Sequence, residues 1–337
     1  MLDLIVSLPQ WALYLIFGSI ILLFLVLDLG IFNRKAKVMS GRAALVQSMF
    51  WIAISLFFGV LIYYNSGDTE SALTFFTAYV TEKALSFDNI FVMLLILRYF
   101  NVKKQYYHRI LTWGILGALI LRGIFIFLGF YLIDLFHGVH YIFAGFLIYS
   151  GIMLFFDKGE ASIDPEKNLV YRFAKKFLPL KDGDHQGKFF VRENGKLLIT
   201  PLFLVLLLVE SSDMFFAADS IPAAFAISDS RFIIFTSNIF AVLGLRALFF
   251  LLSSVIDKFY LLQKGLSFIL VFIGVKMFIG MLGFGLPTFI TFSVILFCLF
   301  SSIMTSLIIP APARTPVEKN PAQKQKIISN SQKVDIK

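Results

Sequence analysis

Two acidic segments lie inside otherwise apolar stretches of the chain, and they contain the residues best suited to chemistry. Residues 81–90 read TEKALSFDNI, and residues 210–222 read ESSDMFFAADSIP. In each segment, two carboxylates stand six residues apart and are followed by Asn or Ser and then Ile. A carboxylate at the centre of a membrane helix costs roughly 2.5–3.5 kcal/mol on insertion scales. The negative charges of five such carboxylates need compensation, and a bound cation is the simplest form of it.

The side chains that accompany these carboxylates are also hard oxygen donors. Asn89 follows Asp88, Ser220 follows Asp219, and neither motif contains Cys or His. Such donors suit Mn²⁺, Ca²⁺ or Mg²⁺ better than Cu(I) or Zn²⁺. The sequence therefore predicts a metal site whose ligands are Glu82, Asp88, Asn89, Glu210, Asp213, Asp219 and Ser220.

Basic residues inside the predicted spans offer a different explanation for the acids. If the acids only paired with Lys83, Arg122, Arg246 and Lys276, the pairs would rarely repay their loss of hydration. We therefore expect a mixed arrangement, in which Lys83, Arg122 and Arg246 compensate the charge of an empty site and are displaced by the arriving cation or repel it. Neighbouring carboxylates are also able to carry protons.

The composition is that of a polytopic membrane protein of the all-α class. The chain has 337 residues, of which 58% are hydrophobic and 15% charged, and its single Cys298 excludes an intrachain disulfide. The first apolar run is too long for a signal peptide. Apolar runs predict about nine transmembrane helices, at residues 8–31, 44–64, 71–97, 109–134, 139–156, 198–226, 232–255, 265–284 and 287–309.

The distribution of Lys and Arg predicts the orientation. Of the 30 basic residues, 25 lie in alternate connections and in the C-terminal tail, whereas the other connections contain only Arg231. By the positive-inside rule, the 25 face the cytoplasm, with the N-terminus outside and the C-terminus inside. This distribution explains the net charge of +9 without nucleic acid as a partner.

The order of motifs indicates an internal repeat. The first acidic segment is followed by Leu121-Arg122 and then a span with Gly151, and the second is followed by Leu245-Arg246 and then a span with Gly274. Each unit has three spans, so the two copies have opposite topology, which is a common transporter plan. The chain thus divides into two N-terminal helices (1–70), a first repeat (71–156), a loop (157–197), a second repeat (198–284), a last helix (285–310) and a basic, disordered tail (311–337).

Helix geometry limits how the acids can meet. At 100° per residue, Glu82 and Asn89 share a face from which Asp88 is displaced, and Glu210 and Asp219 point in opposite directions. A shared site therefore favours local unwinding of the 198–226 span, and Pro222 marks the expected position. Asp28, at the end of the first span, is a candidate ligand at the entrance of the ion path.

The 157–197 loop has structure of its own. Leu169, Val170, Phe173, Phe177 and Leu178 mark one face of a short helix, and Arg172, Lys175 and Lys176 mark the other. This pattern is typical of a helix lying on anionic lipid headgroups. Farther on, Asn194-Gly195 between two apolar runs predicts a β-hairpin.

At these motifs the chain resembles the TerC (tellurium-resistance C) family of integral membrane proteins. The resemblance rests on EKALSFDN (82–89), VESSD (209–213) and FAADSIPA (216–223), with WGILGA (113–118), TSN (236–238) and LGLRAL (243–248) in support. It covers roughly residues 10–310. Ser211-Ser212 replaces a bulkier pair that is common in the family.

The resemblance implies a transporter in metal homeostasis, with manganese efflux as the role of bacterial relatives. We therefore expect H⁺- or Na⁺-coupled export of a divalent metal ion, most simply Mn²⁺, as the transported substrate, with no permanent cofactor. An enzyme is not expected, because no nucleophile or cofactor motif accompanies the acids. The alternatives are a membrane scaffold or stress-response protein with structural acids, and a proton or sodium carrier for pH homeostasis. Expected partners are the metal ion and the bilayer, with a second copy or stress-response proteins as further candidates.

Overall fold

The computed structural model describes most of the chain from Met39 onward. The described residues are 18, 19, 21, 23, 39–136, 138–156, 168–181, 183, 185–193, 195–253 and 259–309. Most of the predicted first span, including Asp28, lies outside them, as do the start of the loop and the tail at 311–337.

Helices dominate the described residues, and their bounds follow the predicted spans closely. Six of them are long and apolar enough to cross a membrane. The chain is therefore an all-α polytopic membrane protein, as the sequence predicts. The elements are α3 (Gly41–Ser66), α4 (Thr69–Tyr99), α5 (Lys104–Leu135), α6 (Val139–Phe156), α7 (Leu169–Phe177), β1 (Phe190–Glu193), β2 (Lys196–Ile199), α8 (Pro201–Ile227), α9 (Arg231–Val242), α10 (Leu245–Leu252), α11 (Leu262–Met281) and α12 (Thr288–Ile308).

Two predicted spans depart from a simple apolar helix. The predicted 232–255 span is formed by α9 and α10, which meet at a bend of 44° and together are long and apolar enough for a seventh crossing. Helix α4 has 31 residues, ample for a crossing, but Glu82, Lys83 and Asp88 interrupt its apolar character. It nevertheless lies at the centre of the bundle, in contact with α3, α8, α9 and α12.

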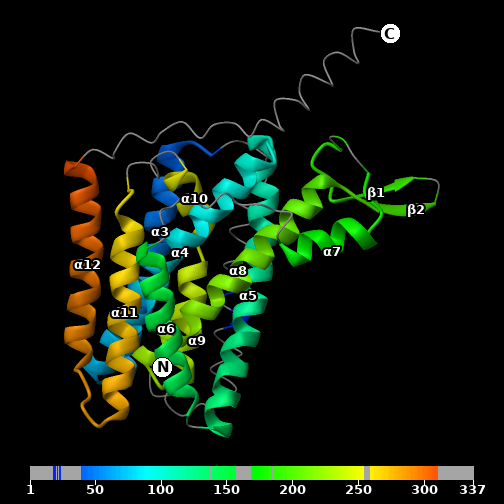
Figure 1. The fold of residues 1–337 in the computed structure, drawn as a ribbon. Coiled ribbons are helices and arrows are strands. Elements are labelled where there is room, and N and C mark those ends of the chain that lie inside the picture. The colour runs from blue at the N-terminus through cyan, green and yellow to red at the C-terminus, as the bar shows by residue number, and fades with distance from the viewer. Residues whose placement is uncertain are drawn as a thin grey trace.

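The contacts between the helices of the bundle (Figure 1) can be compared with those expected from the predicted repeat. Suppose that α4, α5 and α6 correspond to α8, α9–α10 and α11. A two-fold relation between the two units then requires each contact between two helices to recur between their counterparts. Helix α4 packs against α9 as α8 packs against α5, while α4 pairs with α8 and α6 pairs with α11. This exchange is compatible with two related units, and the opposite topology of the repeats stays a prediction.

Two glycines show the same exchange at the contact between α6 and α11. A Cβ atom on Gly151 would lie 2.9 Å from the Ser267 carbonyl oxygen of α11. A Cβ atom on Gly274 would lie 2.9 Å from the Ala144 carbonyl oxygen of α6. Each glycine lies in the second half of its own helix and faces the first half of the other helix, so α6 and α11 are antiparallel. Each glycine also lets the partner backbone approach closely.

A larger side chain at this contact is expected to destabilise the protein. Gly151→Leu would force the helices apart, and overpacking of this kind typically costs about 1–3 kcal/mol. Gly145→Leu is the matched control on α6, because a Cβ atom at Gly145 meets nothing within 4 Å. Thermal unfolding in detergent should show a lower midpoint for Gly151→Leu only, and equal midpoints for the two variants would contradict the close packing.

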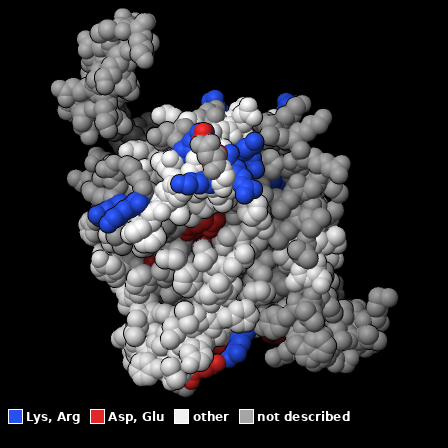
Figure 2. Space-filling model, turned by 90° about the vertical axis from the view of Figure 1, so that its right-hand side faces the viewer, with Lys and Arg blue, Asp and Glu red and all other residues white. Residues whose placement is uncertain are grey.

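The predicted amphipathic helix and hairpin are both present, as α7 and the β1–β2 pair, and they project together from one side of the bundle (Figure 1). Phe173 and Phe177 of α7 are exposed, as expected for residues that face lipid. On the face seen in Figure 2, Lys and Arg gather near the upper end of the molecule, and acidic atoms lie in a hollow below them.

Asp68 caps the start of α4 after the short connection from α3. Its carboxylate accepts hydrogen bonds from the backbone N–H groups of Glu70 and Ser71, at 3.0 Å each, and from Ser71 Oγ at 2.9 Å. These bonds, led by the one from Glu70 N–H, hold the pKa of the Asp68 carboxyl below its ordinary value. The ionised cap therefore stabilises the folded state.

This cap predicts a pH-dependent loss of stability in Asp68→Ala. Because the folded-state pKa is depressed, the stabilisation is complete above the unfolded pKa of about 3.9 and disappears as the pH falls through the folded-state value. The thermal midpoint of Asp68→Ala should lie below that of the wild type at neutral pH and approach it in stronger acid. Asp68→Asn keeps a capping oxygen, so its midpoint should differ less from the wild type at neutral pH.

Candidate functional site

A buried guanidinium lies between two of the predicted acidic ligands. Arg122 of α5 is only 2% exposed. It forms an ion pair with Glu82 of α4, and its Nη2 lies 3.7 Å from Oδ1 of Asp213 of α8. The structure therefore brings one carboxylate from each acidic segment to the same basic group, a pairing expected both from the mixed arrangement and from purely structural ion pairs.

Two amides complete this network. Asn89 donates from Nδ2 to Oδ1 of Asp213 (3.2 Å), and Arg122 donates from Nη1 to Oδ1 of Asn238 on α9 (3.2 Å). Both Asn side chains are buried. We call Glu82, Asn89, Arg122, Asp213 and Asn238 the Arg122 network. It joins α4, α5, α8 and α9 through polar groups in the interior of the bundle.

Oxygen atoms on one side of α8 lack hydrogen-bond partners. They are Oε2 of Glu210, Oδ2 of Asp213 and Oγ of Ser220. At 100° per residue, these three side chains fall within about 80° of one another around the helix. Glu210 is also close enough to Asp213 for their charges to interact. Buried oxygens without donors are rare in folded proteins, and a bound ion is one explanation for them.

Gly117 of α5 makes room for Glu210. A Cβ atom at this position would collide with the Glu210 carboxylate, whereas a Cβ atom at Gly123 would meet only Phe235, at 4.0 Å. Gly117 therefore fixes how closely α5 approaches the acidic side of α8.

Gly117→Ala is expected to lower stability, because a buried carboxylate has to move. Because the clash involves the far end of the flexible Glu210 side chain, which can shift, the loss should lie at the lower end of the about 1–3 kcal/mol typical of overpacking. Gly123→Ala, on the same helix, should be neutral or slightly stabilising because Ala favours a helix over Gly. Thermal unfolding in detergent compares the two, and a loss in Gly123→Ala as large as in Gly117→Ala would contradict the proposed contact.

Asp219 lies apart from the Arg122 network. Its Oδ1 accepts a hydrogen bond from Ser150 Oγ of α6 at 2.7 Å. Since Asp219 is nine residues from Glu210, it points to the opposite side of α8, as the helix geometry predicts. The expected unwinding at Pro222 is wrong, because α8 is helical from Pro201 to Ile227. A proline removes one N–H and bends a helix without having to end it, and Ser150 already satisfies Asp219 where it stands.

The seven predicted ligands are therefore not assembled into one site. Asp88 is half-buried on α4. Among the described residues, no three Asp, Glu, His or Cys side chains come together closely enough to hold a metal ion. Arg122 occupies the space between Glu82 and Asp213, so a shared metal site would need a different position of its guanidinium.

The other two basic residues expected to compensate the acids lie elsewhere. Lys83 donates hydrogen bonds to the carbonyl oxygens of Ala241 and Leu243. Arg246 is buried on α10, with its Nη1 3.5 Å from Nδ1 of His108. Lys83 can make these two bonds because the helix is interrupted between α9 and α10. At this interruption, the carbonyl oxygens of Ala241 and Leu243 have no backbone N–H donor among the described residues. Gly244 makes that break, with a φ of +81° that favours glycine.

Some residues of the site were missed from sequence. Asn238 and Gly117 lie within stretches that resemble the family, and Ser150 precedes the Gly151 of the repeat. Small or polar side chains inside apolar spans were the feature of the sequence that could have identified these residues as part of the site. Asn168 was also missed. Its Nδ2 donates to Ser211 Oγ (3.0 Å), which ties the start of α7 to the residue next to Glu210.

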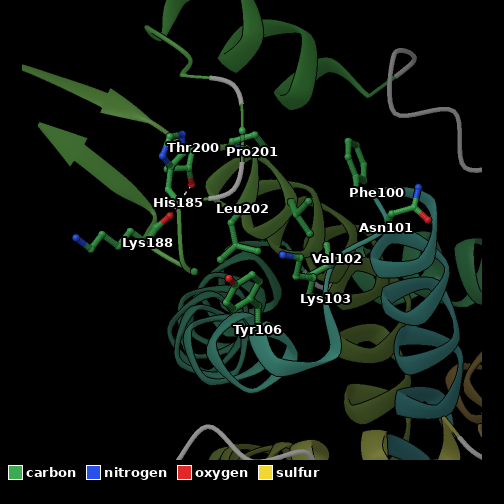
Figure 3. A pocket seen from close by; sticks show the side chains of 13 residues that line it. Phe100, Asn101, Val102, Lys103, Tyr106, His185, Lys188, Thr200, Pro201 and Leu202 are labelled. Carbon is green, nitrogen blue, oxygen red and sulfur yellow. Dashed lines mark hydrogen bonds between the residues drawn. The ribbon is translucent and has the colours of Figure 1, made fainter. Parts of the chain in front are cut away.

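A cavity of about 180 Å³ lies away from the acids, at the beginning of α8. Its lining comes from the α4–α5 connection, the loop before β1 and the first turn of α8 (Figure 3). Labelled residues include Asn101, Lys103, Tyr106, His185 and Thr200. Its lining contains no acidic residue, so it is no part of the predicted metal site.

These features define a polytopic membrane protein with an acidic and basic network buried among its helices. The chain belongs to the integral membrane protein TerC family, whose model matches residues 67–314. It is 45% identical to an uncharacterised membrane protein of Myxococcus xanthus over 87% of this chain and 91% of the relative. It is 42% identical to an uncharacterised membrane protein of Rickettsia bellii, over 88% and 97%.

A further relative has a functional name. A protein of Photorhabdus laumondii, named as a candidate membrane-bound redox modulator, Alx, is 42% identical over 78% of this chain and 84% of its own length. No solved structure matches the chain significantly.

Proposed function

We propose that this protein is a secondary transporter that exports a divalent metal cation, with Mn²⁺ as the favoured substrate. The observation that carries the proposal is the Arg122 network together with the partnerless oxygens of Asp213 and Glu210 beside it. Ionisable groups inside a membrane protein are expensive and commonly line an ion path.

The charge of this region suits a divalent ion. Glu82, Glu210 and Asp213 with Arg122 have a net charge of −2 when all are ionised. A divalent cation neutralises that charge, and carboxylate, amide and hydroxyl oxygens are the ligands that Mn²⁺ prefers among protein groups. Asn89 and Ser220 would complete its coordination. An oxyanion such as tellurite would meet repulsion here.

In this proposal, Arg122 acts as an internal cation that exchanges with the substrate. With no metal bound, its guanidinium compensates Glu82 and Asp213. When the metal arrives, the guanidinium moves away from Asp213, and the carboxylate oxygens turn to the ion. Such an exchange lets the site close around either cation and never leaves the two carboxylates uncompensated in the membrane.

The repeat supplies a route for alternating access. Units of opposite topology can rock against each other about a site at their interface. The Arg122 network lies at such an interface, because it joins α4 and α5 of the first unit to α8 and α9 of the second. Protons or Na⁺ would drive the cycle. Asp88 and Asp219 remain proposed ligands that bind the metal ion in a second conformation of the protein. Asp28 remains a proposed ligand at the entrance of the ion path.

The remaining expectations complete the proposal. The protein would reside in the bacterial inner membrane with its C-terminus in the cytoplasm, act without a permanent cofactor, and catalyse no reaction. The redox name of the relative bears on this chain only indirectly, since a single Cys298 cannot form an intrachain dithiol couple. The two other candidate functions are a scaffold acting through the 157–197 loop, and a proton or sodium carrier.

Metal flux in proteoliposomes tests the proposal. Full-length wild type, Asp88→Asn and Asp219→Asn are reconstituted, and Mn²⁺ movement is followed with and without a pH or Na⁺ gradient. We expect Mn²⁺ flux in the wild type and its loss in both variants.

Each alternative predicts a different result. Absence of metal flux in the wild type would overturn the transport proposal. Equal flux in all three proteins would remove Asp88 and Asp219 from the site. Proton flux without metal would favour the carrier, and a deletion of 157–197 that abolishes the cellular phenotype but leaves flux intact would favour the scaffold.

A further inference from the structure

The bend between α9 and α10 holds a cation that belongs to the protein. Lys83 of α4 donates from Nζ to the carbonyl oxygens of Ala241 (2.9 Å) and Leu243 (3.2 Å). Ala241 and Leu243 are both buried. In the part of the chain that the structure describes, no carboxylate lies within ion-pair distance of Lys83. Neutral groups therefore surround the Lys83 Nζ: the two backbone oxygens, and the Tyr79 ring with its centroid 5.9 Å away.

The break explains why these oxygens are available. In an uninterrupted helix, the Ala241 carbonyl would accept the Leu245 N–H. Here the α9 ladder ends with the bond from Leu243 N–H to Ile239, and the α10 ladder starts with the bond from Leu248 N–H to Gly244. The end of α9 also carries the negative pole of the helix dipole. Carbonyls freed at an interrupted membrane helix are ligands suited to a small cation.

We propose that the α9–α10 break is a monovalent-cation site, that Lys83 fills it with its own ammonium group, and that Na⁺ or K⁺ binds there when Lys83 is removed. Neutral carbonyl ligands suit a monovalent ion, since they supply no negative charge against a second positive one. This position goes beyond the proposed function. It concerns a different ion at a different place, and it stands whether or not the protein moves a metal.

Glycine at position 244 fixes the geometry of this site. A Cβ atom on Gly244 would lie 2.8 Å from Trp51 of α3, and its φ of +81° disfavours other residues. The break is thus held by packing against α3 and does not depend on Lys83 alone. Removing the lysine should leave the carbonyls in place and their cation position open.

Lys276 provides a matched control inside the same bundle. Its Nζ donates to the Ala226 carbonyl oxygen at 3.1 Å, near the end of α8. Ala226 lies in the last turn of α8, and a single carbonyl accepts the bond. Removing Lys276 therefore takes away a lysine–carbonyl contact without opening a pair of carbonyls at a break.

The test compares thermal unfolding of the full-length protein in detergent across salts. Wild type, Lys83→Ala and Lys276→Ala are each measured in NaCl, KCl and choline chloride at equal ionic strength. In Lys83→Ala, the midpoint should rise saturably with Na⁺ or K⁺ relative to choline, by about 2 °C or more. Wild type and Lys276→Ala should show no such rise, and the comparison of NaCl with KCl shows which ion fits.

Binding of radioactive Na⁺ or K⁺ to the purified proteins gives a second readout. Lys83→Ser, which adds a hydroxyl ligand, replaces Lys83→Ala if the latter does not fold in any salt. Saturable binding to the Lys83 variant and none to the wild type would support the site. A folded Lys83 variant without salt-dependent stability or binding overturns the proposal, and so does an equal rise in Lys276→Ala.

Discussion

Arg122→Met is expected to destabilise the metal-free protein more than any other single substitution considered for this chain. The change keeps a long side chain but removes the charge that compensates Glu82 and Asp213. Removing one partner of a buried ion pair typically costs about 3–5 kcal/mol, because an uncompensated buried charge remains. Thermal unfolding in detergent with a metal chelator measures the loss.

Added Mn²⁺ should then separate a structural role from internal competition with the substrate. If Arg122 stands where the metal binds, Mn²⁺ should stabilise Arg122→Met more than the wild type. At 100 times the dissociation constant, a ligand adds about 2.7 kcal/mol. The exposed pair between Arg231 and Asp134 gives the control, since disrupting it with Arg231→Met should cost about 0–1 kcal/mol. Equal Mn²⁺ stabilisation in the wild type and Arg122→Met would argue against competition.

Asp213→Asn should have the largest effect on transport. Asp213 is the carboxylate on which both segments converge: Asn89 donates to its Oδ1, Arg122 lies 3.7 Å away, and its Oδ2 has no hydrogen-bond partner. Loss of groups that only orient a metal ligand costs about 10–100-fold. Loss of the charged ligand itself should therefore lower Mn²⁺ flux in proteoliposomes by about 100-fold or more.

Controls for this variant distinguish charge from folding. Asp213→Asn is close in size to the wild type, so a normal elution profile would show that the loss is not one of folding. Asp134→Asn, at an exposed position, should transport normally. If Asp213→Asn keeps most of the wild-type flux while Asp219→Asn loses it, then the site lies on the Ser150 side of α8 and the Arg122 network is structural.

The helices and their order could be predicted because hydropathy is local. A run of apolar residues long enough to cross a bilayer has few other stable conformations, since its backbone must satisfy its own hydrogen bonds in lipid. The hairpin was predictable for a similar reason, from Asn194-Gly195 between two apolar runs. The predicted repeat is compatible with the similar positions of Gly151 and Gly274, each of which lies against the backbone of the other helix. Helix α4 could be recognised in the sequence despite its charged residues because the residues on both sides of those charges are strongly apolar.

The position of the helix break could not be predicted, because proline and glycine act through context. Pro222 suggested an interruption in α8, yet that helix continues to Ile227. The break lies at Gly244, where α3 approaches with Trp51 and where Lys83 supplies the hydrogen bonds that the backbone lacks. Trp51 and Lys83 are both distant in sequence from Gly244, so only tertiary packing could reveal the arrangement.

The sequence by itself determined which residue types carry charge into the membrane and on which spans they lie. Glu82, Asp213 and Arg122 were identified from type and spacing alone. Tertiary structure decided their partners, because the rotation of each helix about its axis selects which side chains meet. It joined Arg122 to Glu82 and Asp213, turned Asp219 toward Ser150, and placed Lys83 at a helix break. Charge is a property of the residue, whereas the partner of a charge depends on packing between helices.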